Sequence, residues 1–183
     1  MKKLSKIFWL TCAFSILFTL GCQKDEIPEF SKQGEEIADQ EARNIIVSST
    51  IDGVLEYKMK ANYMEKFIKK NITYIDTVEI TSYRKDGSIE IILTCNRAEL
   101  DEVNNVFVGT GDVVVTSDNA ILKTPYLRWD RLTDKFLAKN GVTILREGSI
   151  LQGEEMRSDA LMNTIEITKV SAEGTLDEKD IDW

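Results

Sequence analysis

The sequence contains no histidine, and its 183 residues include only three cysteines. Without histidine, metal sites lose their commonest ligand and catalytic triads lose their usual general base. Adjacent carboxylates such as Asp101-Glu102 and Glu154-Glu155 fall at turns of an acidic chain, where exposure to solvent explains them better than catalysis. We therefore expect a protein that is not an enzyme and that needs no metal and no cofactor.

The cysteines allow no disulfide within the folded part of the chain. Cys12 lies inside an apolar N-terminal run and Cys22 ends that run, so Cys95 stands alone in the remainder. Cys95 follows Leu93 with the spacing of one strand face, and a free cysteine behaves as a small buried hydrophobe. Stability must therefore come from an apolar core that includes Cys95.

Positive charge is also scarce, because 23 Lys and Arg face 31 Asp and Glu, which gives a formal net charge of −8. Phosphate backbones are bound by neutralising cations, so this balance argues against a nucleic-acid partner. It argues equally against adhesion to an anionic membrane surface through charge. An anionic lipid ligand would have to be held mainly by its apolar part.

The longest apolar run extends from Ile7 to Cys22, which is short for a membrane span of about 20 residues. Three lysines precede the run, as in an export signal. The run ends in Phe18-Thr19-Leu20-Gly21-Cys22, which resembles a bacterial lipobox, although Thr19 and Leu20 stand in exchanged order.

We therefore expect residues 1–21 to be a lipoprotein signal peptide and Cys22 to be the lipidated residue. A plain signal peptide and an uncleaved anchor helix are the alternatives. Residues 22–42 are acidic and poor in apolar side chains, which favours a disordered tether over a short helix at 34–43. Loss of the three signal lysines would move the formal charge from −8 to −11.

We expect residues 43–183 to form one further domain, because their amino-acid pattern is typical of an all-β protein. Short runs rich in β-branched and aromatic residues alternate with turn signals. The clearest turn signals are Asp52-Gly53, Lys85-Asp86-Gly87 and Asn104-Asn105. Asp-Gly between apolar runs is among the strongest hairpin signals. Only Tyr63–Lys70 has a plausible helical pattern.

An internal repeat organises this domain, since Phe136 follows Phe107 by 29 residues (136 − 107) and the match continues without a gap. A looser offset of 34 (95 − 61) relates Ala61 to Cys95. Each unit reads as two strands and two turns, and such a unit must stack on its neighbours to bury its apolar face. The repeat predicts an elongated structure of two sheets around an apolar interior.

Repeat-equivalent side chains on the apolar face are the candidate ligand-binding residues. They are the pairs Phe107 and Phe136, Val113 and Val142, Val115 and Ile144, Leu122 and Leu151, and Leu127 and Met156. Leu122 and Leu151 are preferred to their neighbours because Ile121 and Ile150 share a face with Lys123 and Gln152. This interior is either an open groove for acyl chains or an ordinary filled core, and periodicity does not separate the two.

Five short motifs recur in order along this domain: Lys60-Ala61-Asn62-Tyr63, Cys95–Leu100, Gly109–Val115, Leu127-Arg128-Trp129-Asp130 and Gly153–Asp159. In their order and spacing, over about residues 43–176, the chain resembles the LptC branch of the LptA/LptC (OstA-like) family. The resemblance implies an elongated periplasmic β-jelly-roll, or β-taco. Such a protein takes lipopolysaccharide from an inner-membrane ABC transporter and passes it to an LptA-like protein by contact between strand edges.

The resemblance also implies attachment to the inner membrane, which we prefer to the outer membrane for this chain. A structural or adhesive β-repeat lipoprotein with a filled core and no lipid ligand is the alternative. Basic clusters such as Lys66/Lys69/Lys70 and Arg128/Arg131 are better explained as solvated surface charge than as a site for lipid phosphates.

Overall fold

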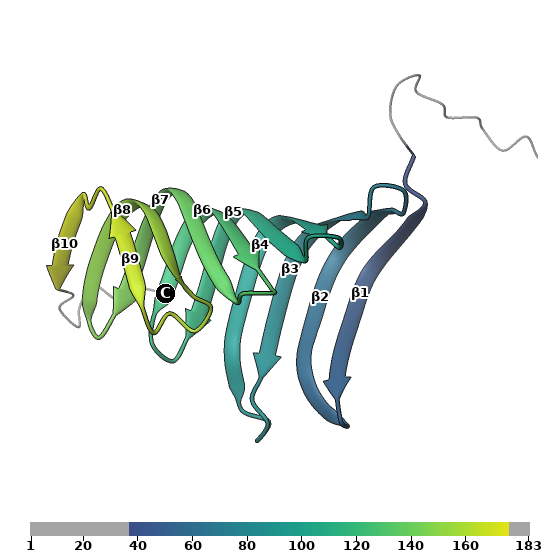
Figure 1. Ribbon diagram of the computed structural model, residues 1–183, viewed down its shortest axis with the longest axis horizontal. Helices are drawn as coiled ribbons and strands as arrows, with labels where there is room; N and C mark the ends of the chain where they lie inside the picture. The colour runs from purple at the N-terminus through teal and green to yellow at the C-terminus, as the bar shows by residue number, and fades with distance from the viewer. Residues whose placement is uncertain (1–36, 176–183) are drawn as a thin grey trace, which may run out of the picture. The chain divides into compact units, whose positions relative to one another are not determined.

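The computed structural model describes residues 37–175, and every regular element in this range is a β-strand. The strands are β1 (Gln40–Ile51), β2 (Val54–Phe67), β3 (Ile72–Tyr83), β4 (Ile89–Asp101), β5 (Val106–Ser117), β6 (Ile121–Asp130), β7 (Lys135–Arg146), β8 (Ser149–Asp159), β9 (Ile165–Thr168) and β10 (Ala172–Thr175). They form one antiparallel sheet in chain order from β1 to β8, and both β9 and β10 pair with β8 (Figure 1). The predicted all-β fold is confirmed.

A line of left-handed residues crosses the middle of this sheet. Asn44, Thr77, Asp112 and Asn140 in the odd-numbered strands β1 to β7, and Lys169 between β9 and β10, have φ values from +47° to +69°. From β4 to β8 the strand registers shift at the same line. An extra residue bends a strand and increases its twist, so we call this line the crease.

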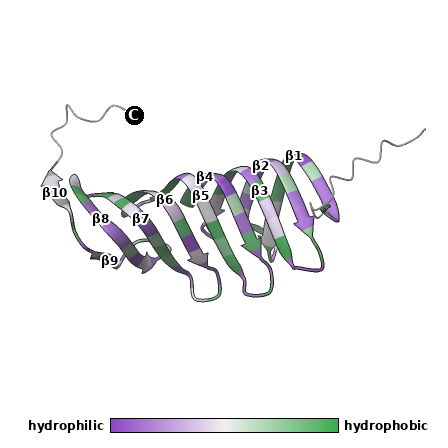
Figure 2. Ribbon diagram, turned by 90° about the horizontal axis from the view of Figure 1, so that it is seen from above, coloured by the Kyte–Doolittle hydropathy of each residue, from purple (hydrophilic) through white to green (hydrophobic). Residues whose placement is uncertain are grey.

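The sheet folds over at the crease. Ile91 and Leu100 lie near opposite ends of β4, and nine residues of straight strand would separate them by about 30 Å. Both side chains nevertheless line one cavity. The two halves of the sheet therefore face each other, and hydrophobic and hydrophilic residues alternate along the strands that form them (Figure 2).

One core cluster fills the space between the halves. Its fully buried large side chains are Ile75, Leu93, Val113, Val115, Leu122, Leu127, Ile144, Met156 and Met162. The prediction of two sheets is wrong in one respect, because the structure has a single sheet that faces itself. Each strand from β1 to β8 continues across the crease, so the same strands supply both layers.

The 29-residue repeat corresponds to one hairpin, since β7 and β8 repeat β5 and β6. Leu127 pairs with Gly109 as Met156 pairs with Ala138, which places the two side chains equivalently. The looser offset of 34 relates β2 to β4, which have 14 and 13 residues against 10 and 11 in β6 and β8. The period loosens because the strands of the N-terminal half are longer.

Two kinds of turn end the hairpins. Gly53 and Gly87 adopt φ values of +81° and +85°, as the predicted Asp-Gly turns require. At the other ends, Asp101 accepts hydrogen bonds from the Asn104 and Val103 N–H groups at 2.9 and 3.0 Å. The backbone hydrogen bond from Asn104 is the main cause that lowers the pKa of Asp101 below its ordinary value.

The N-terminal strand begins earlier than the predicted domain boundary at residue 43. Gln40–Arg43 pair with Tyr63–Lys66, so β1 starts at Gln40. Backbone hydrogen bonds make this pairing and need no apolar side chain, which is why the acidic composition concealed it. Tyr63–Phe67 complete β2 instead of forming a helix. The predicted signal peptide and Cys22 lie outside the described residues.

Candidate functional site

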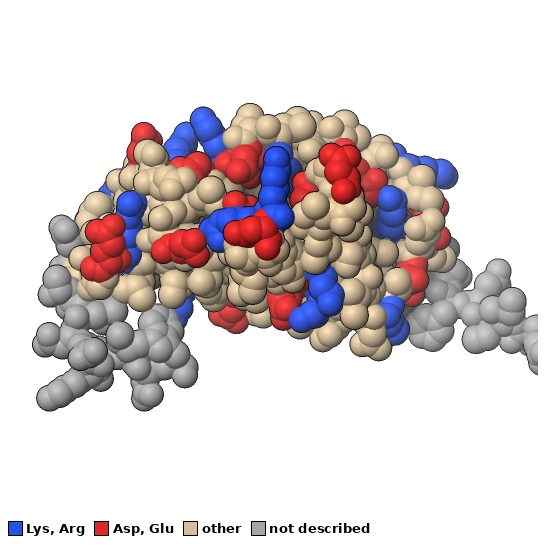
Figure 3. All heavy atoms as spheres, turned by 90° about the horizontal axis from the view of Figure 1, so that it is seen from below, with Lys and Arg blue, Asp and Glu red and all other residues tan. Residues whose placement is uncertain are grey.

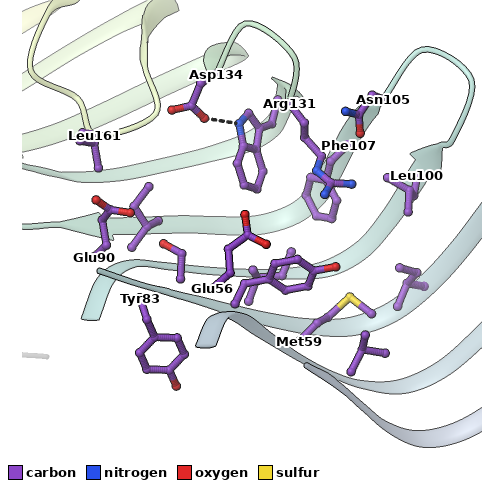
Figure 4. Close-up of a pocket in the computed structure, with 17 residues that line it drawn as sticks. Glu56, Met59, Tyr83, Glu90, Leu100, Asn105, Phe107, Arg131, Asp134 and Leu161 are labelled. Atoms are coloured by element: carbon purple, nitrogen blue, oxygen red, sulfur yellow. Dashed lines mark hydrogen bonds between the residues drawn. The ribbon is translucent and has the colours of Figure 1, made fainter. Parts of the chain in front are cut away.

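A cavity of about 460 Å³ lies between the two halves of the folded sheet, at its N-terminal end (Figure 4). Its lining comes from β1 to β6, from the turn between β4 and β5, from the turn between β6 and β7, and from the turn between β8 and β9. The lining residues are Val47, Glu56, Tyr57, Met59, Ile75, Ile80, Ser82, Tyr83, Glu90, Ile91, Leu100, Asn105, Phe107, Trp129, Arg131, Asp134 and Leu161. The volume falls within the range of small-molecule binding sites, about 300–1,000 Å³.

The inner wall of the cavity is apolar because the strands direct their core-facing side chains into it. Ile75, Ile91 and Phe107 are buried, while Met59 and Leu100 are half-buried and pack against the core cluster. The Ser82 Oγ is a buried polar atom on this wall, and it has no hydrogen-bond partner within the described residues. The cavity can thus surround an apolar ligand and offers it one hydroxyl.

Three aromatic rings form the boundary between the cavity and the filled core. The Trp129 ring meets the Phe107 ring edge-on at 6.4 Å and the Phe136 ring at 5.7 Å between centroids. Trp129 Nε1 donates a hydrogen bond to Asp134 Oδ1 at 3.1 Å, which fixes the orientation of the indole. Phe107 lines the cavity and Phe136 does not, so Trp129 separates two repeat-equivalent phenylalanines.

Charged groups occupy the rim of the cavity. Glu56 accepts a hydrogen bond from Ser49 Oγ at 3.0 Å, and Glu90 lies 4.0 Å from Arg84 Nε. Arg131 is exposed and makes no ion pair with any described residue. On the face that Figure 3 shows, basic and acidic side chains are interspersed. The rim is polar on both sides, as suits a ligand with an apolar and a polar end.

The basic residues that were expected to cluster have different surroundings in the structure. Lys66 Nζ lies 2.7 Å from Glu102 Oε1, and Arg128 lies 3.9 Å from Asp130. The hydrogen bond from Lys66 is the first cause that lowers the pKa of Glu102. These two cations are therefore paired at the surface, whereas Arg131 lies at the rim.

The structure brings the ten predicted ligand-binding residues onto one inner face but places only Phe107 on the cavity. Val113, Val115, Leu122, Leu127, Phe136, Val142, Ile144 and Met156 are buried in the filled core, and Leu151 is half-buried against it. Ligand contact at these nine positions stays a prediction.

The cavity opens among β1 to β4, where the 29-residue repeat fails. Sequence reasoning missed Tyr57, Met59 and Ile80 because they have no partner at that spacing. The signal that could have found them is the longer offset of 34 itself, since longer hairpins extend further from the crease. We call β1 to β4 the open half of the sheet. In the sequence this half is marked by the failure of the 29-residue repeat.

Cys95 is a packing residue, as predicted. It is a free, buried thiol whose Sγ would lie 3.3 Å from a Cβ added to Gly109. Burial is the main cause that raises the pKa of Cys95 to about 11. Since the thiolate is the nucleophilic form, this thiol is inert at neutral pH.

Within residues 37–175 no helix is long and apolar enough to cross a membrane. The same range holds no group of three or more carboxylate or thiol side chains placed to bind a metal ion.

Comparison with known proteins identifies relatives of the chain and of its fold. The family model described as lipopolysaccharide-assembly, LptC-related, matches residues 9–173. A search of curated protein sequences finds no match. Among solved structures, the chain is similar to LptH from Pseudomonas aeruginosa, the LptA-homologous periplasmic component of the lipopolysaccharide transport device. The TM-score is 0.53 at 14% identity, over 62% of this chain and 82% of that one.

Proposed function

The chain belongs to the LptC-related family of lipopolysaccharide-assembly proteins, and from this premise we propose how it takes part in lipopolysaccharide transport. The cavity between the halves of the folded sheet binds the acyl chains of lipopolysaccharide, and the sheet edges pair with neighbouring proteins of the transport route. The observation that carries the proposal is the open, apolar-walled cavity at the N-terminal end of an otherwise filled core.

The energetics of acyl chains suit this cavity. Each methylene removed from water contributes about 0.8 kcal/mol, so ten buried methylenes contribute about 8 kcal/mol without any ion pair. An acidic protein of net charge −8 needs such a mode of binding for an anionic lipid. The polar headgroup would remain at the rim, where Glu56, Glu90 and Arg131 meet solvent.

The edges of the sheet offer sites for strand addition. Within residues 37–175, β1 pairs with another strand along one backbone edge only, and it exposes Ile46 by 64% and Ile51 by 58%. Long exposed edges of this kind are normally avoided because they recruit other strands. The opposite edge is formed by β9 and β10, four residues each. In our proposal β1, which follows the N-terminal anchor along the chain, meets the transporter subunits, and the β9–β10 edge meets an LptA-like protein.

The proposed location follows from the same arrangement. The domain resides in the periplasm and is tethered by a lipid on Cys22 to the inner membrane, where the ABC transporter lies. Residues 23–36 would connect that lipid to the domain, and a chain of this length reaches at most about 50 Å. The cavity therefore works close to the membrane from which the lipid is extracted.

Photo-crosslinking at two tyrosines tests the proposal. Tyr57 lines the cavity, whereas Tyr126 is half-buried on β6 and does not line it, so a photo-reactive phenylalanine analogue replaces either one with little change in size. With purified lipopolysaccharide, we expect adducts at position 57 and none at position 126. Equal labelling at both positions, or none at either, would contradict the proposal and favour a structural lipoprotein.

A further inference from the structure

The turn between β8 and β9, residues 159–164, is buried more deeply than a hairpin tip should be. Ala160 is 1% exposed and Met162 is 0% exposed, and both belong to the core cluster. The corresponding turn after β6 instead exposes Leu132 by 74%. We call residues 159–164 the plug, because two of its side chains enter the space between the two halves of the sheet.

Four hydrogen bonds fasten the plug to the opposite lip of the folded sheet. Ser117 Oγ and Asn119 Nδ2 each donate to the Leu161 carbonyl at 3.1 Å, and Asn119 Nδ2 also donates to Asn163 Oδ1 at 2.9 Å. Arg146 Nη1 donates to the Asn163 carbonyl at 3.2 Å. Ser117 and Arg146 are the last residues of β5 and β7, and Asn119 lies in the turn between β5 and β6. The plug begins beside Lys135, at the other end of β7, so these bonds close the mouth of the folded sheet.

The plug also forms the end wall of the cavity. Leu161 lines the cavity, while Ala160 N donates at 3.0 Å to the backbone carbonyl of Asp134, the residue whose carboxylate also accepts the hydrogen bond from Trp129 Nε1. Met162 has a φ of +57°, a left-handed conformation that is unfavourable for a side chain of this kind. The plug thus combines two buried side chains and a strained backbone with four hydrogen bonds, of which the two to Asn163 are exposed and the two to the Leu161 carbonyl are partly buried. Elements of this kind open locally at less cost than a paired strand.

From this geometry we infer that the plug is a gate in the lipid path. When it is closed, the plug confines an acyl chain to the cavity among β1 to β6. When the plug is displaced, the cavity becomes continuous with the inner face of β5 to β8. On that face Val115, Ile144 and Met156 belong to the same core cluster as the side chains of the plug. The inference rests on the proposed function, because it concerns the passage of the same lipid from the open half toward the β9–β10 edge.

A reversible lock across the mouth tests the gate. Asn119→Cys with Asn163→Cys replaces two side chains that already touch, and Cys95 does not interfere because it is buried. Photo-reactive phenylalanine analogues at Phe107 and, separately, at Phe136 then report on the two sides of Trp129. Lys60→Cys with Glu79→Cys provides the control disulfide, since those residues are paired on neighbouring strands away from the mouth.

With purified lipid A, the reduced double-cysteine protein should be labelled at both positions. Oxidation should remove at least nine-tenths of the labelling at Phe136, leave Phe107 unchanged and be reversed by reductant. The control disulfide should alter neither. Unchanged labelling of Phe136 after oxidation would overturn the gate, and so would labelling of Phe107 with none at Phe136 in any form.

A second measurement needs no ligand and separates failure of the gate from failure of the proposed function. Amide hydrogen exchange of Ala160 and Met162 should be at least 100-fold faster than that of the β7–β8 ladder and faster still in Asn119→Ala/Asn163→Ala. If the plug amides exchange hydrogen only through global unfolding of the domain, the inference that the plug is a gate is wrong, even if lipid labels Phe107. Absence of lipid at Phe107 would overturn the proposed function, and with it the gate in the lipid path, whatever the plug amides do.

Discussion

Shortening Ile144 to alanine should lower the free energy of unfolding by about 3 kcal/mol. Ile144 lies near the C-terminal end of β7, where it pairs with Leu122 and Leu151, and its side chain is fully buried. Three carbons are lost, which removes about 2.4 kcal/mol of transfer free energy. The sheet on either side is held by hydrogen bonds and cannot close the hole, so the remaining cavity adds the rest.

Met59→Ala is the matched change in the open half. It also removes three heavy atoms, but Met59 is half-buried and already borders the cavity. No new hole forms, so we expect a loss of about 1 kcal/mol, while binding of lipopolysaccharide should weaken because part of the apolar wall is gone. For a domain of this size 1 kcal/mol corresponds to about 4 °C in Tm, which predicts losses of about 12 °C and about 4 °C.

Urea unfolding followed by circular dichroism, together with calorimetry, measures both variants. The m-value should stay constant, so that the shift in midpoint reports stability alone. Similar losses for Ile144→Ala and Met59→Ala would refute the division of the interior into a filled half and an open half. A normal affinity of Met59→Ala for lipid would place the ligand elsewhere.

Three further predictions concern the crease, the C-terminal edge and the buried thiol. Thr77→Asn should raise stability by about 1 kcal/mol in urea unfolding, because a β-branched residue is held at φ +55° and asparagine tolerates that region; a loss would show that Thr77 is not strained. Gly153→Ala should loosen β9 and speed amide exchange of Ile167, because the added Cβ would collide with that side chain; unchanged exchange would contradict the packing. Cys95 has its pKa raised to about 11 in the folded state from 9.0, so the stability it contributes is complete below about pH 9 and is lost as the pH rises toward 11. Cys95→Ala should lack this part of the alkaline decline, and identical pH profiles would refute it.

The strand order was predictable because local signals agree with one another. Asp52-Gly53 and Asp86-Gly87 mark hairpins, and the 29-residue spacing of Phe107 and Phe136 assigns hairpin to hairpin. The face of each side chain followed from alternation, so the ten candidate residues do share the inner side of the sheet. The pairing of neighbouring strands depends on turn residues and on the alternation of side chains, and both are local features that can be read from the sequence.

The position of the opening was not predictable in the same way. An apolar residue has the same alternation whether it packs against the other half of the sheet or lines a cavity, so Val115 and Met59 look alike in sequence. What separates them is the crease and the plug. Thr77 gives no sign of a left-handed conformation, and Met162 reads as a loop residue although it fills the core. Both depend on contacts between segments distant in sequence.

Quenching of Trp129 by brominated acyl chains tests the central claim most directly. In the variant Trp9→Phe/Trp183→Phe, Trp129 is the single tryptophan, and its ring borders the cavity. Lipid A with brominated acyl chains should quench its fluorescence in a saturable manner, and excess unbrominated lipid A should reverse the effect. Saturable binding of the brominated lipid without any quenching of Trp129 would show that the acyl chains do not enter the cavity.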